Sequence, residues 1–293
     1  MSQGPEIDGF AQPHDIKLHY TVWNADADDT TLLVHGLNRE LHVWDSVAER
    51  LAATRRVICV DLRGHGRSGW AADGYSVQAF ASDLAGLLDH LGIEEIQYTS
   101  HSLGSRIGIA FAATWRGRLR HLLLSECGPE IPRDQALALR EFSRNRRSWF
   151  DSPEETLGHL RALNPAWQDE FHRKALEHEY RTNWVGKVVR RADPELHWLY
   201  ETEIVEGNPY LWECWSRITA PITVLWAAES GFFDDRIIAR MREAQPGMSL
   251  YRPKGTHYFL RESPEEFLRF AEAALAPVRR GVARTSGSRR VER

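Results

Sequence analysis

Short apolar runs alternate with amphipathic segments over the first 125 residues of the chain. Residues 32–34 and 57–60 are continuous apolar runs of the length of buried strands, and 47–51 between them has helical spacing. A longer helix is predicted over 76–91, where apolar residues share one face and Gly92 follows. Because strands alternate with helices, the pattern predicts an α/β fold, a mostly parallel sheet with helices on both faces.

Further strands are predicted at both ends of this region. Residues 16–22 alternate apolar with polar side chains, which predicts a half-exposed antiparallel strand at the sheet edge. Apolar runs at 121–126, 222–226 and 249–251 predict later strands. The capping box Ser263-Pro264-Glu265-Glu266 predicts the start of a last helix.

The pattern changes between about residues 128 and 217. Aliphatic strands disappear, and charged, tryptophan-rich helices replace them, one of them starting at the capping box of residues 152–155. The prediction is an α/β core formed by residues 1–129 and 218–276, with a helical cap at 130–217. The arginine-rich run 144–147 is interpreted as a solvated helix face. Residues 277–293 contain six arginines without periodicity and predict a disordered basic tail.

Bulk properties narrow the classes of partner. The net charge of the 293 residues is −4, which favours neither nucleic acid nor an anionic membrane as a partner. Three cysteines without metal-ligand spacing suit a reducing compartment. With neither a leader-like N-terminus nor a membrane-length apolar run, we expect a cytoplasmic protein, monomeric or homodimeric, that binds a small molecule.

The stretch 97–108 carries the strongest chemical signal. A β-prone run leads into Ser100-His101-Ser102-Leu103-Gly104, and a helix-compatible segment follows. This pattern, small-X-Ser-X-small, predicts a nucleophile elbow, a sharp strand-to-helix turn that exposes the central serine. Ser102 is therefore the candidate nucleophile. Ser100 departs mildly from the usual glycine.

The loop 64–69 matches the dinucleotide-binding fingerprint letter for letter. It follows an interior strand, however, and leads into another loop instead of a helix that would cradle a pyrophosphate. We interpret it as a structural loop.

Four motifs in order resemble those of the α/β-hydrolases. They are Val34-His35-Gly36-Leu37, the loop from Asp61 to Ser68, the elbow, and Gly255-Thr256-His257-Tyr258. The resemblance runs from about residue 14 to 275 and is weakest between 130 and 217. It implies an α/β-hydrolase fold with an inserted cap, acting as a serine hydrolase without a cofactor or metal.

The resemblance also implies the residues of the site. His257 matches the base, and the backbone N–H groups of Leu37 and Leu103 match the oxyanion hole. The common family pattern places an aspartate after the penultimate strand, but Ser230 stands there. Glu126 ends the strand after the elbow helix, the other position that supplies the acid, as in haloalkane dehalogenases and fungal resorcylic-lactone hydrolases such as zearalenone lactonase.

Asp234 and Asp235 remain alternative acids. The order Ser102, acid, His257 holds for these residues as well as for Glu126, so order alone does not decide. The stretch 229–234 also resembles the corresponding turn of the resorcylic-lactone hydrolases.

These observations lead to a functional hypothesis with two alternatives. The chain is expected to cleave a carboxylic ester or lactone through an acyl-enzyme on Ser102. The many cap tryptophans favour a bulky or aromatic substrate if some of them line the pocket, although each suits the cap core better. The alternatives are a carbon–carbon bond hydrolase of a vinylogous diketone, using the same residues, and a non-catalytic ligand receptor.

Overall fold

The computed structural model describes residues 4–275, so the predicted tail at 277–293 lies outside the described residues. Its centre is an eight-stranded sheet with the order β1-β2-β4-β3-β5-β6-β10-β11. Along this order the six strands from β4 to β11 run parallel, whereas β2 pairs antiparallel with β1 on one side and with β4 on the other. The α/β class predicted from the apolar pattern is confirmed. The strands are β1 (Ile7–Ala11), β2 (Leu18–Trp23), β3 (Thr30–Val34), β4 (Arg56–Val60), β5 (Ile96–His101), β6 (Leu119–Ser125), β10 (Ile222–Leu225) and β11 (Ser249–Tyr251).

The prediction that the strand at 16–22 is a half-exposed edge was wrong. β2 lies between β1 and β4, and all six of its residues are buried. The polar residue His19 is enclosed because its Nδ1 lies 2.7 Å from the buried carboxylate of Asp61. At His19, therefore, a polar residue in an alternating pattern marks a buried hydrogen bond and not contact with solvent.

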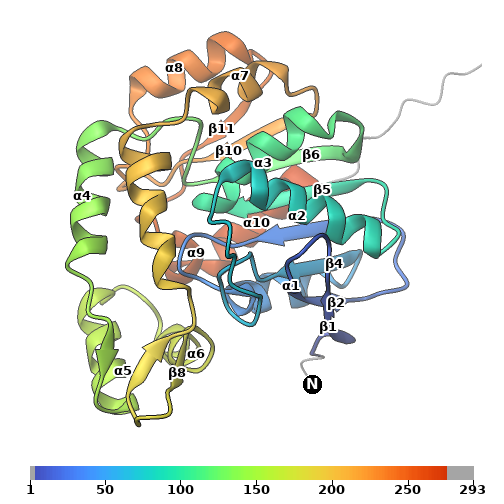
Figure 1. Ribbon diagram of the computed structural model, residues 1–293. Helices are drawn as coiled ribbons and strands as arrows, with labels where there is room; N and C mark the ends of the chain where they lie inside the picture. Colours follow the sequence, from blue (N-terminus) through green and yellow to red (C-terminus); the bar gives the residue numbers. More distant parts are fainter. Residues whose placement is uncertain (1–3, 276–293) are drawn as a thin grey trace, which may run out of the picture.

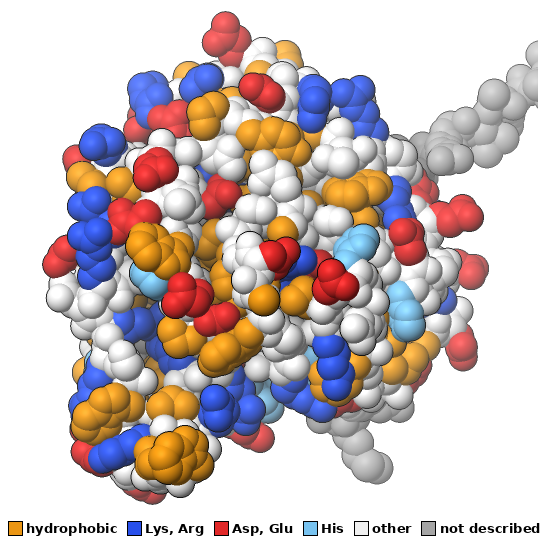
Figure 2. All heavy atoms as spheres, in the orientation of Figure 1, with side chains coloured by type: hydrophobic (Ala, Val, Ile, Leu, Met, Phe, Trp, Pro, Cys, Tyr) orange, Lys and Arg blue, Asp and Glu red, His pale blue; other side chains and the backbone are white. Residues whose placement is uncertain are grey.

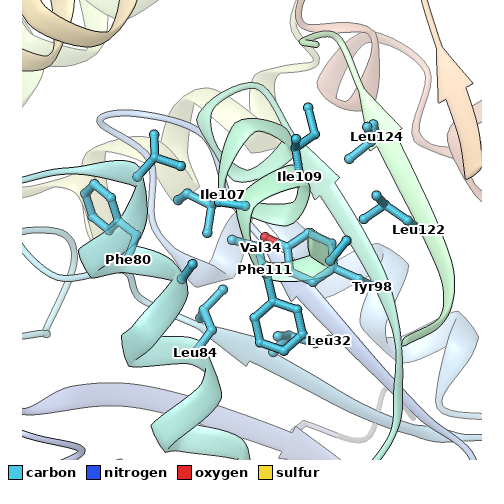
Figure 3. Close-up of a cluster of buried hydrophobic side chains, with 14 of the residues drawn as sticks. Leu32, Val34, Phe80, Leu84, Tyr98, Ile107, Ile109, Phe111, Leu122 and Leu124 are labelled. Carbon is cyan, nitrogen blue, oxygen red and sulfur yellow. The ribbon is translucent and has the colours of Figure 1, made fainter. Parts of the chain in front are cut away.

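Helices cover both faces of the sheet (Figure 1). On one face lie α2 (Val77–His90), α3 (Leu103–Thr114), α7 (Pro209–Arg217) and α8 (Asp235–Ala244); on the other lie α1 (Asp45–Leu51), α9 (Phe259–Glu262) and α10 (Pro264–Leu275). Neighbouring strand residues point to opposite faces, so Leu32 and Val34 belong to one core cluster and Leu33 to the other. Figure 3 shows part of the first cluster, in which Phe111 of α3 lies beside Tyr98 of β5 and α2 contributes Phe80.

The loop at 61–69 folds around the carboxylate of Asp61. The N–H groups of Leu41 and Arg67 donate to Asp61 at 2.8 and 2.9 Å. A Cβ atom on Gly66 would lie 2.2 Å from this carboxylate, so the position requires glycine. The glycines therefore serve a tight turn around a buried acid, as the interpretation as a structural loop requires.

Most of residues 130–217, called here the inserted segment, lie beside the main sheet (Figure 1), whereas the last helix of the segment, α7, packs on the sheet face. The segment has a core cluster of its own around Phe150, Leu160 and Trp167. The helix after Ser152 begins as the capping box predicts, because the Ser152 hydroxyl accepts from the Glu155 N–H. Before α7 it contains α4 (Arg133–Arg144), β7 (Trp149–Phe150), α5 (Pro153–Leu163), α6 (Asp169–Glu179), β8 (Tyr180–Thr182), β9 (Val188–Arg190), the 3₁₀-helix η3 (Pro194–His197) and the π-helix η4 (Tyr200–Val205).

The prediction that the inserted segment is helical was only partly correct. β7, β9 and β8 form a small antiparallel sheet, which the sequence pattern missed because its strands are only two or three residues long. The division into a core and a cap stays a prediction. None of the helices between residues 4 and 275 combines the length and the hydropathy needed to cross a membrane.

Candidate active site

Ser102 occupies a strained turn between β5 and α3. Its backbone has φ 55° and ψ −119°, outside the regions that ordinary residues favour. A Cβ atom on Gly104 would lie 2.4 Å from the Val34 carbonyl oxygen, so the second small position requires glycine. Serine fits at position 100 because its hydroxyl donates to the Leu123 carbonyl at 3.0 Å. The predicted elbow geometry is therefore present.

His257 lies in the loop after β11, over the elbow. Its Nε2 is 3.1 Å from Ser102 Oγ, within hydrogen-bond distance. The Phe232 ring stacks on the imidazole, with centroids 3.5 Å apart and planes 10° from parallel. Of the thirteen histidines, this one faces Ser102, as the loop motif predicts. The sequence pattern did not identify Phe232, although it lies in the loop that had drawn attention for its acidic residues.

Glu126 lies behind His257, one residue after the end of β6. Its Oε1 accepts a hydrogen bond of 2.5 Å from the Ala227 N–H. Its Oε2 lies 3.5 Å from His257 Nδ1, and neither atom has a hydrogen-bond partner among residues 4–275. The backbone of Glu126 is left-handed, with φ 67°, a conformation that costs a non-glycine residue energy. The structure thus brings Ser102, His257 and Glu126 into one line.

The alternative acids lie elsewhere. Asp234 is the N-cap of α8, where its side chain accepts from the Ile237 N–H at 2.7 Å. Asp235 is exposed in the first turn of the same helix. Ser230, at the usual position of the acid, is buried and its side chain helps to lower the pKa of Glu126. The geometry therefore favours Glu126, although its role in catalysis stays a prediction.

Burial shifts the pKa values of Glu126 and His257 in opposite directions. Burial raises the pKa of Glu126 to about 7, although the Ala227 N–H stabilises its charged form. Burial, with a contribution from Arg39, lowers the pKa of His257 to about 3. Neutral His257 beside Glu126 is the form that a general base requires.

His101 contacts the backbone of His257. His101 Nε2 is 2.7 Å from the carbonyl oxygen of His257, and the two rings are 4.7 Å apart. Burial and the proximity of His257 lower the pKa of His101 to about 3. A neutral His101 must carry its proton on Nε2 to donate this bond, which leaves its Nδ1 unprotonated. The motif loop placed His101 near the site, but only the structure shows this bond.

A cavity of about 60 Å³ adjoins Ser102. Leu37 and Leu103, predicted to supply the oxyanion-hole N–H groups, both line it, as do Leu139, Tyr200 and Ile204 from the inserted segment. No tryptophan of the inserted segment lines this cavity in the described part of the chain; Trp167 and Trp215 are buried, and Trp149, Trp184 and Trp198 are exposed. The expectation that some of these tryptophans contact a bulky substrate was wrong for this cavity.

Arg39, at the wall of this cavity, belongs to a buried ionic cluster. The Glu179 carboxylate lies 2.9 Å from Arg39, 2.8 Å from Arg261 and 3.5 Å from Arg190. Burial alone would raise the pKa of Glu179, but the three guanidinium groups lower it to about 2. One carboxylate is therefore shared by three arginines, which ties the inserted segment to the loop after β3. No local sequence pattern indicated this cluster.

Arg106 makes a second link between the core and the inserted segment. It is almost fully buried on α3 and donates to the carbonyl oxygens of Pro129 and Glu203 at 3.2 and 2.6 Å. Glu203 lies in η4, so this side chain holds the π-helix that carries Tyr200 against the elbow helix.

One group of described residues has the spacing of metal ligands. Potential ligand atoms of Glu40, His42 and His178 lie within 4.8 Å of one another. Glu40 Oε2 already accepts from the His42 N–H at the start of η1 (Leu41–Trp44), and His42 Nδ1 lies 3.2 Å from Asp45. These local contacts therefore explain the positions of Glu40 and His42, two of the three groups.

Comparison with known proteins identifies the family. The model of the α/β-hydrolase fold family matches residues 30–264, most of the chain. The chain belongs to this family. It is 28% identical over 265 residues to a 3-hydroxybutyrate-oligomer hydrolase of Cupriavidus necator, covering 82% of this chain and 87% of the relative. It is 26% identical over 249 residues to an N-formylmaleamate deformylase of Pseudomonas putida, covering 83% and 86%.

A solved structure supports the same fold. The crystal structure of an E-2-(acetamidomethylene)succinate hydrolase superposes with a TM-score of 0.84 at 21% identity, covering 92% of this chain and 99% of that one. The predicted α/β-hydrolase fold is confirmed, and with hydrolases among the sequence relatives the chain is a hydrolase.

Proposed function

We propose that the protein cleaves a carboxylic ester, open-chain or lactone, through an acyl-enzyme on Ser102. The observation that carries this proposal is the distance of 3.1 Å between His257 Nε2 and Ser102 Oγ on a strained elbow. A serine hydroxyl is a weak nucleophile at neutral pH, and a neutral imidazole at this distance supplies the base that it lacks.

The proposed reaction has two halves. Ser102 Oγ attacks the ester carbonyl carbon while His257 Nε2 takes the hydroxyl proton, and the N–H groups of Leu37 and Leu103 stabilise the oxyanion. The imidazolium returns its proton to the departing alcohol, and the carbon–oxygen bond of the ester breaks. A water then attacks the acyl-enzyme with His257 again as base, which releases the acid and restores Ser102.

Glu126 has an electrostatic role in this scheme. Its Oε2 faces His257 Nδ1, so an ionised Glu126 stabilises the imidazolium that forms in both halves. The distance of 3.5 Å is longer than a strong hydrogen bond. Contacts of this kind are often long without substrate and shorten when the imidazolium develops.

Two of the relatives support an ester, whereas a third is named as a deformylase. The relative from Cupriavidus necator is named for hydrolysis of 3-hydroxybutyrate oligomers, and another, 28% identical over 234 residues, is an esterase of Mycobacterium tuberculosis. We further propose that the inserted segment acts as a cap, because Leu139, Tyr200 and Ile204 cover the cavity at Ser102.

Covalent labelling together with turnover tests the proposal. A fluorophosphonate should add once, on the peptide that contains Ser102, and Ser102→Ala should abolish both labelling and hydrolysis of 4-nitrophenyl esters. Ser216→Ala, which removes an exposed hydroxyl on α7, is the matched control and should change neither. Labelling that persists in Ser102→Ala would refute the assignment, and ligand binding without turnover would favour a receptor.

A further inference from the structure

A second, larger cavity opens between the inserted segment and the core. Its volume is about 590 Å³, in the range of small-molecule sites, against about 60 Å³ for the cavity at Ser102. Asn38 and Trp70 contribute from the core, and the rest of the lining comes from the inserted segment. Tyr200 lines both cavities, and its hydroxyl lies 3.2 Å from Asn38 Nδ2. The two spaces are thus neighbours separated by the Tyr200 side chain.

The lining of this larger cavity is strongly basic. Two carboxylates, those of Asp193 and Glu201, face six guanidinium groups. Figure 2 shows basic side chains along the α4 side of this face. The arginines are Arg140, Arg144, Arg146, Arg147, Arg181 and Arg190.

The acidic groups nearby neutralise only part of this charge. Arg147 pairs with Glu155 at 2.7 Å. Glu201 is shared by Arg140 and Arg144. Asp193 is engaged as an acceptor, because Tyr75 Oη donates to it at 2.5 Å. Arg190 shares Glu179 with two other arginines.

Arg146 and Arg181 have no carboxylate partner among the residues that the structure describes. The Nε atoms of Arg140, Arg146 and Arg190 are buried and have no hydrogen-bond partner in the same part of the chain. Burial and the positive charge of Arg190 lower the pKa of Arg146 to about 10, so it remains charged at neutral pH. Like charges crowded together with unsatisfied donors raise the energy of the empty cavity, and an oxyanion would remove both costs.

We propose that this cavity binds a carboxylate carried by the substrate, with Arg146 as its principal partner. The inference rests on the proposed ester hydrolysis and adds the substrate class: an ester with a free acid group on the part that lies beyond Tyr200. The planar guanidinium matches the two oxygens of a carboxylate, and the low-dielectric walls concentrate the positive field on the cavity. The reacting carbonyl then occupies the small cavity at Ser102.

Matched pairs of esters test this proposal. The probes are the mono(4-nitrophenyl) esters of succinate, glutarate and adipate. Each is compared with the diester in which the second carboxylate is methylated. We expect kcat/KM for at least one free acid to exceed that of its capped partner by about tenfold or more, because a charge-assisted hydrogen bond contributes on that scale. The preference should weaken as the salt concentration rises.

Variants then assign the effect to the cavity. Arg146→Gln and, separately, Arg181→Gln should lower kcat/KM for the free acid, the former by about tenfold to a hundredfold, and leave the capped ester within about threefold. Arg146→Lys keeps the charge and should restore part of the preference. Arg242→Gln, which removes an exposed arginine of α8, is the control and should change neither ester.

The outcomes separate this inference from the proposed function. Equal rates for free and capped esters in the wild type, or an equal loss on both in Arg146→Gln, would overturn the inference while hydrolysis by Ser102 stands. If no ester is cleaved, calorimetry with glutarate decides: binding that Arg146→Gln removes supports the carboxylate site, and the absence of binding refutes it. Stronger competition by inorganic phosphate than by glutarate would also overturn the assignment to a carboxylate.

Discussion

His101 Nε2 lies 2.7 Å from the carbonyl oxygen of His257, so the residue that precedes the proposed nucleophile holds the backbone of the proposed base. The elbow and the loop after β11 are joined by this contact as well as by the one between Ser102 and His257. His101 has no role in proton transfer in this scheme; it is a positioning residue.

His101→Ala should lower kcat by about tenfold to a hundredfold, because small displacements of a catalytic group cost that much. KM should change less than kcat, because Leu139, Tyr200 and Ile204 still line the cavity at Ser102. His101→Gln, whose amide can donate to the same carbonyl, should recover part of kcat. Steady-state kinetics of the three proteins measures this; equal losses of kcat in both variants, or a rise in KM that exceeds the loss of kcat, would contradict a positioning role.

Glu126 and Asp234 form a matched pair for the identity of the acid. Glu126→Gln should lower kcat on the order of 10³- to 10⁴-fold without unfolding the protein, because the imidazolium loses its counter-charge. Asp234→Asn should leave kcat nearly unchanged, since Asp234 is the N-cap of α8. Loss of kcat in Asp234→Asn with retention in Glu126→Gln would reverse the assignment.

Local sequence signals were sufficient for the fold and for the candidate residues of the site. The elbow around Ser102 and the loop with His257 are each contained in a few residues whose types the turn dictates, and Glu126 follows directly from a predicted strand. The edge strand β1 was not predicted, because Ile7–Ala11 has no clear alternation of apolar and polar residues. As a result, β2 was wrongly placed at the edge.

The remaining features depend on contacts between distant residues. Arg39 and Glu179 are 140 positions apart, and nothing near either residue shows that they pair. The run 144–147 reads as a solvated helix face, whereas the structure places Arg144, Arg146 and Arg147 at a cavity that β9 and η3 complete. α4 ends at Arg144, so Arg146 and Arg147 lie in the loop after it, and the pattern of one segment cannot show which other elements will lie against it.

The raised pKa of Glu126 predicts that kcat/KM falls on the acid side of the pH profile. The scheme requires Glu126 to be ionised and His257 to be neutral; the pKa of His257 is lowered to about 3, so the pKa of Glu126, about 7, is limiting. On a neutral ester, kcat/KM should therefore rise with pH through about 7 and level off above it. A profile measured from pH 5 to 9 tests this. This fall should be absent from the residual activity of Glu126→Gln, and a flat wild-type profile would contradict the assignment.

The cluster at Glu179 predicts a pH-dependent contribution to stability. The pKa of Glu179 is lowered to about 2 in the folded protein from an ordinary value of 4.5, so its charge stabilises the fold above about pH 4.5. Glu179→Gln leaves three buried guanidinium groups without their shared partner and should lower the free energy of unfolding by about 3 to 5 kcal/mol at pH 7. Arg242→Gln, which removes an exposed charge, should change it by less than about 0.5 kcal/mol.

The sign of the pH effect follows from the same shift. As pH falls below about 4.5, the unfolded chain takes up a proton at Glu179 before the folded one does. The wild type therefore loses the extra unfolding free energy that it has over Glu179→Gln. Urea unfolding of wild type and Glu179→Gln at several pH values between 7 and 3.5 should show the difference in unfolding free energy shrinking towards the acid end. A difference that stays constant over this range would show that Glu179 stabilises the protein by packing and not by its charge.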